Sequence, residues 1–381
     1  MKLAELLAQF PAFSLATREN NDEILAFFNQ TSMNTPLIDI QYNRGPDFFS
    51  FLQKSSNQYF VLIARDKSGK LGFVASLIIR KGRINNKNTD VGYLGDLRIA
   101  PKLELVVAWK KLLSILLYNL SQIEELNGLK YLITAVMDEN SKAINSLIKK
   151  AKNEFIYRKL SAYRMVNVFA KVPFYQYSNK YHIGFAKQDD RSTLTSFLKK
   201  QNQDRAFGFS YDGEQNELSR RLNSWDNFTL EQFILVKNQH KQIIACVAPH
   251  NPSPHKSILV KSISWKIRVL LKPISLIKPM PKAGMELNIA YLTHLEIAKD
   301  LEKDLRTKVF NNLLAWTWQQ GVFVNAHIVA LCDFERTLQD GLKGFIYTTE
   351  PMSLYQVYHY EHENLLQEVG TMPPGFEMAL V

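Results

Sequence analysis

The sequence carries one apolar motif twice, as Tyr93-Leu-Gly-Asp-Leu-Arg-Ile-Ala100 and as Tyr291-Leu-Thr-His-Leu-Glu-Ile-Ala298. Each copy follows two apolar segments joined by a polar turn, at residues 60–75 in the first half and at residues 233–248 in the second. Apolar segments bounded by polar turns are typical of β-strands in hairpins. The repeated order of these elements predicts that one folding unit occurs twice.

Each copy continues with a long helical segment and a further apolar strand. This unit is too long for a solenoid repeat, so it indicates a duplicated α+β domain. We expect two tandem domains, at residues 1–174 and 181–381, each a mixed, mostly antiparallel sheet flanked by helices. A strand at residues 155–172 is expected to close the first sheet, and residues 172–181 are the expected linker.

The bulk composition is that of a globular protein. The chain has 381 residues, of which 46% are hydrophobic and 22% charged, which is enough for two domains with full cores. Cys246 and Cys332 lie in apolar runs, which favours a reducing compartment over a disulfide framework. No apolar run reaches the ~20 residues that a membrane span needs. We therefore expect a soluble, cytoplasmic protein.

The net charge of +11 is unevenly distributed. Residues 1–175 hold 24 basic and 15 acidic side chains, whereas the remainder holds 23 and 21. The first half is thus the better candidate for a polyanionic ligand. Residues 232–285 contain nine basic and no acidic side chains. This stretch is interpreted as the solvated face of an amphipathic hairpin; an anionic partner or membrane surface is the alternative.

The element order, together with Leu97-Arg-Ile-Ala-Pro101 and Asn140-Ser-Lys-Ala143, resembles the GNAT superfamily of N-acyltransferases. In that family the fourth strand splays from the fifth at a bulge, and the gap admits the pantetheine arm of acetyl-CoA. A bulge leaves backbone groups unpaired, so a peptide-like ligand can bind almost as an added strand. The resemblance implies that Leu97, Arg98 and Ile99 bind the cofactor.

The helix that follows departs from the family pattern. After Pro101 the sequence has no glycine-rich loop of the kind that binds a diphosphate, although Lys102 could supply charge there. The second copy has three acidic residues at this place, within residues 299–304, so it is expected to be degenerate. Asn140 is expected to cap a helix, and the resemblance implies that it also touches pantetheine.

Two residues are the candidates for proton transfer. Asp96 directly precedes the expected bulge, and a carboxylate there could act as the general base toward the substrate amine; a structural strand-end role is the alternative. The tyrosine that the family often uses as general acid is missing, so Tyr157, or else Tyr163, is proposed in its place. His294 matches Asp96 in the second copy and is expected to be structural. No metal site is expected, because His359 and His362 lack further ligands.

The leading interpretation is an acyl-CoA-dependent N-acyltransferase whose active site lies in the first domain. Acetyl-CoA is the expected donor, with another acyl-CoA as an alternative, and a small-molecule or peptide amine is the expected acceptor. No nucleic acid is expected as a partner. The competing interpretation is a non-catalytic binding or interaction protein on a decayed GNAT scaffold, since fold alone does not determine function.

Overall fold

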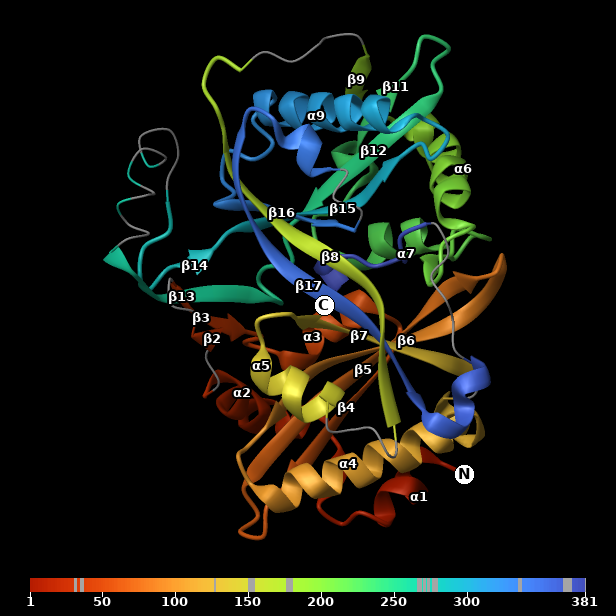
Figure 1. Ribbon diagram of the computed structural model, residues 1–381, viewed down its shortest axis with the longest axis vertical. Coiled ribbons are helices and arrows are strands. Elements are labelled where there is room, and N and C mark those ends of the chain that lie inside the picture. The colour runs from red at the N-terminus through yellow and green to blue at the C-terminus, as the bar shows by residue number, and fades with distance from the viewer. Residues whose placement is uncertain are drawn as a thin grey trace.

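The structure of the chain, a computed structural model, is organised around one large mixed β-sheet (Figure 1). It describes all residues except 31–32, 35–37, 127, 150–154, 176–180, 266–268, 270–271, 273–274, 276–279, 335–337, 366–371 and 381. Most of the expected linker therefore lies outside the described residues. Within the described part of the chain, no helix is long and apolar enough to cross a membrane.

The large sheet contains 13 of the described strands. Along the sheet their order is β1 (Phe13–Leu15), β4 (Gln58–Arg65), β5 (Leu71–Ile84), β6 (Lys87–Ile99), β7 (Leu129–Met137), β17 (Phe345–His359), β8 (Phe155–Lys171), β16 (Ile328–Asp333), β15 (Ile289–Ile297), β12 (Ile243–His250), β11 (Ile234–Lys237) and β9 (His182–Phe185), with β10 (Gly208–Phe209) paired to β5.

The sheet repeats the same pattern from each outer edge to its centre. β6 and β7 are parallel, as are β15 and β16, whereas the other pairs among the described strands are antiparallel. The two halves meet at the long pair β17–β8, which runs from the pairing of Phe345 with Lys171 to that of His359 with Phe155. The equal strand order in both halves confirms the duplication and the α+β fold class.

The two central strands are exchanged between the halves. β17, from the end of the chain, lies between β7 and β8, whereas β8 pairs with β16 of the second half. The expectation that residues 155–172 close the first sheet is therefore wrong, and β17 fills that place. Alternation predicts a strand but not the sheet edge to which it adds. The division of the chain at residues 174 and 181 stays a prediction.

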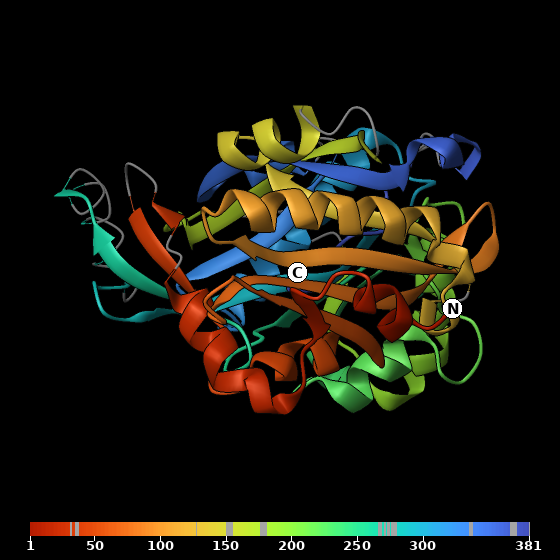
Figure 2. The same ribbon diagram turned by 90° about the horizontal axis from the view of Figure 1, so that it is seen from below.

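Helices cover both faces of the sheet. They are α1 (Leu3–Ala8), α2 (Asn21–Asn29), α3 (Phe48–Ser55), α4 (Leu103–Tyr118), α5 (Ser141–Ala143), α6 (Arg191–Asn202), α7 (Glu217–Ser224) and α9 (Lys303–Gln319). In the first half, α1 and α4 pack on one face of the sheet, and α2 and α3 pack on the other (Figure 2).

Side-chain alternation along β5 explains these two layers. Phe73, Ala75 and Leu77 join the core beneath α4, whereas Val74 and Ile78 join the phenylalanine-rich core beneath α2 and α3. Successive side chains of a strand point to opposite faces, so one apolar strand serves both cores.

A second, small sheet joins the halves. Its strand order is β14 (Glu286–Leu287), β13 (Ser257–Ile263), β3 (Ile38–Asn43) and β2 (Met33–Asn34). β3 comes from the first half and β13 from the basic stretch of the second, and they pair antiparallel (Figure 1). Part of the basic stretch therefore packs against the first half.

Candidate active site in the first half

A β-bulge interrupts β6 one residue before the predicted place, which was Leu97 to Ile99. Gly95 pairs with Ser76 and Arg98 pairs with Val74, so β6 has one residue more than β5 between these pairs. Asp96 has a φ of 53°, a left-handed conformation that is uncommon for a residue other than glycine. The bulge thus lies at Asp96 and Leu97, directly before Arg98 and Ile99.

The ladder between β6 and β7 ends before the bulge is reached. Their parallel ladder runs from the pairing of Asp90 with Leu129 to that of Tyr93 with Ile133. Past that point, the described link is a hydrogen bond that Thr134 Oγ1 donates to the Leu94 carbonyl at 2.8 Å. Residues 93–99 are half-buried, so this part of the β6 edge is accessible. An extended ligand could add to it.

β15 repeats the bulge at the matching position. Thr293 pairs with Ala248 and Glu296 with Cys246, and His294 between them has a φ of 49°. The ladder between β15 and β16 also ends early, at the pairing of Tyr291 with Ala330. Leu97 and Leu295 thus follow equivalent bulge residues.

In the second half, the C-terminal segment contacts the bulge. The His294 backbone N–H donates to Glu377 Oε1 at 2.9 Å, and the Glu377 carboxylate is paired with the fully buried Arg221. His294 is itself buried, and burial moves its pKa well below the usual value, so the imidazole is neutral. These contacts support the expected structural role of His294.

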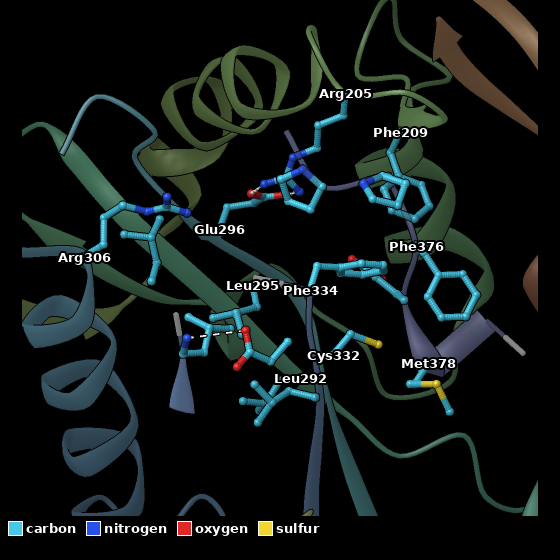
Figure 3. A pocket seen from close by; sticks show the side chains of 17 residues that line it. Arg205, Phe209, Leu292, Leu295, Glu296, Arg306, Cys332, Phe334, Phe376 and Met378 are labelled. Carbon is cyan, nitrogen blue, oxygen red and sulfur yellow. Dashed lines mark hydrogen bonds and ion pairs between the residues drawn. The ribbon is translucent and has the colours of Figure 1, made fainter. Parts of the chain in front are cut away.

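The remaining cleft in the second half lies between β15 and β16 (Figure 3). Arg205 donates two hydrogen bonds of 2.8 Å to Glu296 on one side, and Phe376 and Met378 of the C-terminal segment line the other. Leu295, Glu296 and Ile297, which match Leu97, Arg98 and Ile99, line this cleft, whereas the N–H of the bulge residue His294 is bound by Glu377.

The cofactor residues expected from the sequence are arranged around the opening between β6 and β7. Lys102 precedes α4, and its ammonium group is paired with Asp66, whose pKa is lowered by this lysine and by Ser68. Asn140 follows β7 and caps α5 by accepting a hydrogen bond from the Ala143 N–H at 3.1 Å. The helix cap is confirmed, whereas the cofactor contacts of both residues stay predictions.

The two tyrosines lie on β8. Tyr157 packs against the core beneath α4, with its ring 6.5 Å from that of Tyr355, and burial raises its pKa. The Tyr163 hydroxyl lies 3.6 Å from the Met378 sulfur, and the ring is buried beside Phe376. A raised pKa makes tyrosine a weaker proton donor, and strands β7 and β17 lie between β6 and these tyrosines. The role of Tyr157 as general acid stays a prediction.

Asp96 lies in a strongly cationic environment. Arg44 Nη2 donates to Asp96 Oδ1 at 2.7 Å and Ser76 Oγ donates to Oδ2 at 2.9 Å, and the arginine and aspartate side chains are 5% and 9% exposed. Burial alone would raise the pKa of Asp96, but Arg44, Ser76 and Arg98 outweigh it, so the pKa is lowered. Asp96 is therefore ionised at neutral pH.

Sequence reasoning missed Arg44 and Lys256. Arg44 follows β3 in a turn that shows no recognisable motif, and Lys256 is one basic residue of the long basic stretch. The pairing of β3 with β13 brings both residues toward Asp96, although Lys256 is far from Asp96 in the sequence. A local pattern cannot reveal such a contact.

Comparisons with solved structures agree with this architecture. N-myristoyltransferase from Saccharomyces cerevisiae with bound myristoyl-CoA is 11% identical, with a TM-score of 0.56 over 91% of this chain and 82% of that chain. A structure of the same enzyme with bound myristoyl-CoA and inhibitors is 10% identical, with a TM-score of 0.57 over 97% of this chain and 84% of that chain. A fungal multi-domain beta-N-acetylglucosaminidase with a GCN5-related glucosamine N-acetyltransferase region is 11% identical, with a TM-score of 0.57 over 91% of this chain and 38% of that chain.

The chain has the GNAT N-acyltransferase fold. No protein-family model matches the sequence, and no curated protein is similar enough to count as a match. The shared GNAT fold explains the coincidence of bulge, splayed strands and following helix in both halves.

Proposed function

We propose that the protein is an acyl-CoA-dependent N-acyltransferase whose active site is the bulged edge of β6. The observation that carries this proposal is the contrast between the two halves. On β6, Asp96 is ionised, residues 93–99 are half-buried, and the ladder between the described strands β6 and β7 ends at Tyr93. On β15, His294 is neutral and buried, and its N–H is bound by Glu377. The bulge of the second half is thus neutral and bound by the C-terminal segment, although a cleft remains beside it between β15 and β16.

In this proposal the pantetheine arm adds to β6 at Leu97, Arg98 and Ile99, with Asn140 at the end of β7 beside it. Lys102 supports the diphosphate, helped by the free N–H groups at the start of α4. Leu103 and Val107, which are 76% and 44% exposed on the first turns of α4, offer apolar surface where the family has glycine. Acetyl-CoA or a longer acyl-CoA is the donor.

The reaction joins the acceptor nitrogen to the acyl carbon. The neutral amine attacks the thioester carbonyl, the C–N bond forms, and the C–S bond breaks to release CoA. Asp96 accepts the amine proton directly or through one water, and a β6 backbone N–H stabilises the oxyanion. Tyr157 is the proposed donor of a proton to the leaving thiolate. The acceptor is a small-molecule or peptide amine, and the composition favours a cytoplasmic location.

Ligand titration tests the proposal. We expect acetyl-CoA, myristoyl-CoA or CoA to raise the melting temperature and to bind in calorimetry, and we expect Lys102→Glu combined with Asn140→Ala to weaken that binding about tenfold or more. Lys303→Glu is the control, because Lys303 begins α9, the helix that follows β15 in the second half as α4 follows β6 in the first. Absence of binding by every acyl-CoA would favour the non-catalytic interpretation.

A further inference from the structure

Three cationic side chains gather around the single carboxylate of Asp96. Arg44 pairs with it directly, and Arg98 and Lys256 lie close enough to influence charge in this cluster. Phe51 and Tyr291 form its walls: the Arg44 guanidinium lies 4.1 Å from the Phe51 ring centroid, and Lys256 Nζ lies 5.2 Å and 5.3 Å from the Phe51 and Tyr291 centroids. Basic side chains thus outnumber the Asp96 carboxylate in this cluster.

Donors in this cluster are left without acceptors. Arg44 is only 4% exposed, and among the described residues its Nε and Nη1 atoms have no hydrogen-bond partner. Lys256 is 6% exposed and has no carboxylate at ion-pair distance in the described part of the chain. Burial and the neighbouring Arg44 together lower the pKa of Lys256 to about 7. Buried donors without acceptors are costly, so an anionic ligand would stabilise this arrangement.

The cluster lies on the sheet face opposite α4. Ser76, which donates a hydrogen bond to Asp96, lies on the same face of β5 as Val74 and Ile78, which belong to the core beneath α2 and α3. Arg98 stacks on Phe28 of α2 at 4.7 Å, and Phe51 belongs to α3. The cofactor diphosphate would lie at the start of α4, on the other face. The anion that suits the cluster therefore belongs to the acceptor.

We propose that Arg44 and Lys256 bind a carboxylate of the acceptor, which makes the acceptor an amino acid or another amine with a nearby carboxylate. The proposal rests on the proposed acyltransferase function. The cluster adjoins the bulge where the thioester would lie, so binding the carboxylate here would hold the neighbouring amine close to the acyl carbon. Buried arginine and lysine donors favour an ionised carboxylate over a neutral amide.

Product mimics test this inference without acyl transfer. A panel of N-acetyl derivatives of the twenty common amino acids is titrated against the protein by calorimetry, alongside the corresponding N-acetyl methylamides, which lack the carboxylate. We expect at least one acid to bind roughly tenfold or more tightly than its methylamide, as expected for hydrogen bonds to a charged group. Arg44→Gln and Lys256→Met should each reduce this preference. Lys67→Met, at an exposed position in the turn between β4 and β5, should leave it unchanged.

Several outcomes would overturn the inference. These are no binding by any acid, equal binding of acid and methylamide, or a preference that survives both substitutions. Arg44→Lys keeps the charge and should retain part of the preference, which separates charge from loss of fold. Acyl transfer to amines without a carboxylate, at rates equal to those for amino acids, would overturn the acceptor class and leave the acyltransferase proposal intact. Acids that bind while no acyl-CoA binds would overturn both the acyltransferase proposal and the acceptor role.

Discussion

Asp96 and His294 show how one backbone position can serve two purposes. Both residues have positive φ at the bulge of equivalent strands. Asp96 is ionised among cations beside an accessible edge, whereas His294 is neutral, buried and bound through its N–H to Glu377. The bulge geometry was retained in both copies, but the chemistry at the bulge differs. We place the reaction in the first copy for this reason.

Asp96→Asn should lower acyl transfer by roughly 10²–10⁴-fold, the usual effect of losing a general base, with acyl-CoA affinity little changed. Asparagine keeps the size of the side chain but removes its basicity. Steady-state turnover with a panel of amines measures this effect. The substitution also leaves Arg44 without a counter-charge and lowers the free energy of unfolding by about 3 kcal/mol, so the assay uses a temperature at which both proteins are folded. Ser76→Ala is the control for loss of one hydrogen bond. Equal turnover by the two proteins would remove Asp96 from the mechanism.

Lys256 should make stability depend on pH. Its pKa is about 7 in the folded protein, where Arg44, Asp96 and Tyr291 face it, whereas the ordinary pKa of lysine is 10.5. The unfolded chain therefore binds more protons between these values, so the contribution of Lys256 to the free energy of unfolding rises as the pH increases from 7 toward 10. Urea denaturation should show this rise in the wild type relative to Lys256→Met, and Lys256→Met should be the more stable protein at pH 7. A constant difference between them across this range would contradict the assigned pKa.

At the scale of elements, the sequence was informative where a signal is local. The repeated motifs predicted the duplication, because strand alternation and turns depend on neighbouring residues. The family resemblance implied a bulge at Leu97 to Ile99, directly after Asp96, and the bulge lies one residue earlier, at Asp96 and Leu97. The cationic cluster and the contact of the C-terminal segment could not be predicted. Arg44, Lys256 and Glu377 reach their partners through pairings between distant segments, and no local pattern encodes these contacts. The predicted role of Tyr157 rests on the family resemblance alone.

The C-terminal segment should be a major source of stability for the second half. Glu377→Gln removes a carboxylate that pairs with Arg221, which is 0% exposed and already has an unpartnered Nη2 within the described structure. Losing one member of a buried ion pair costs about 3 kcal/mol, although Glu217 still pairs with Arg221. Urea denaturation measures the loss. Asp300→Asn, which disrupts an exposed pair with Lys200, should cost less than about 1 kcal/mol. Similar costs for the two variants would show that the Glu377 contact is not important for stability.

At the scale of the whole molecule, the exchange of β8 and β17 makes each half depend on the other. β17 supplies the strand next to β7, and β8 supplies the strand next to β16. The small sheet adds a second connection through β3 and β13. The cationic cluster needs both connections, since Arg44 follows β3 and Lys256 precedes β13. The proposed acceptor site is therefore a property of the joined halves, and not of the first half alone.

Separating the halves should consequently abolish independent folding. A fragment of residues 1–174 keeps β8 but lacks β17, so β7 would present an unpaired edge, and the long β17–β8 ladder would be lost. Unpaired edges promote aggregation, so we expect this fragment to be insoluble or to give poorly dispersed amide signals by NMR when expressed alone. Co-expression with residues 181–381 should restore a soluble one-to-one complex, because the exchanged strands can pair between chains as they do within one. Size-exclusion chromatography with light scattering measures the complex, and acyl-CoA titration measures whether its site is restored. A fragment of residues 1–174 that is monomeric, well folded and competent to bind acyl-CoA would contradict this dependence and would show that β17 is dispensable for the site.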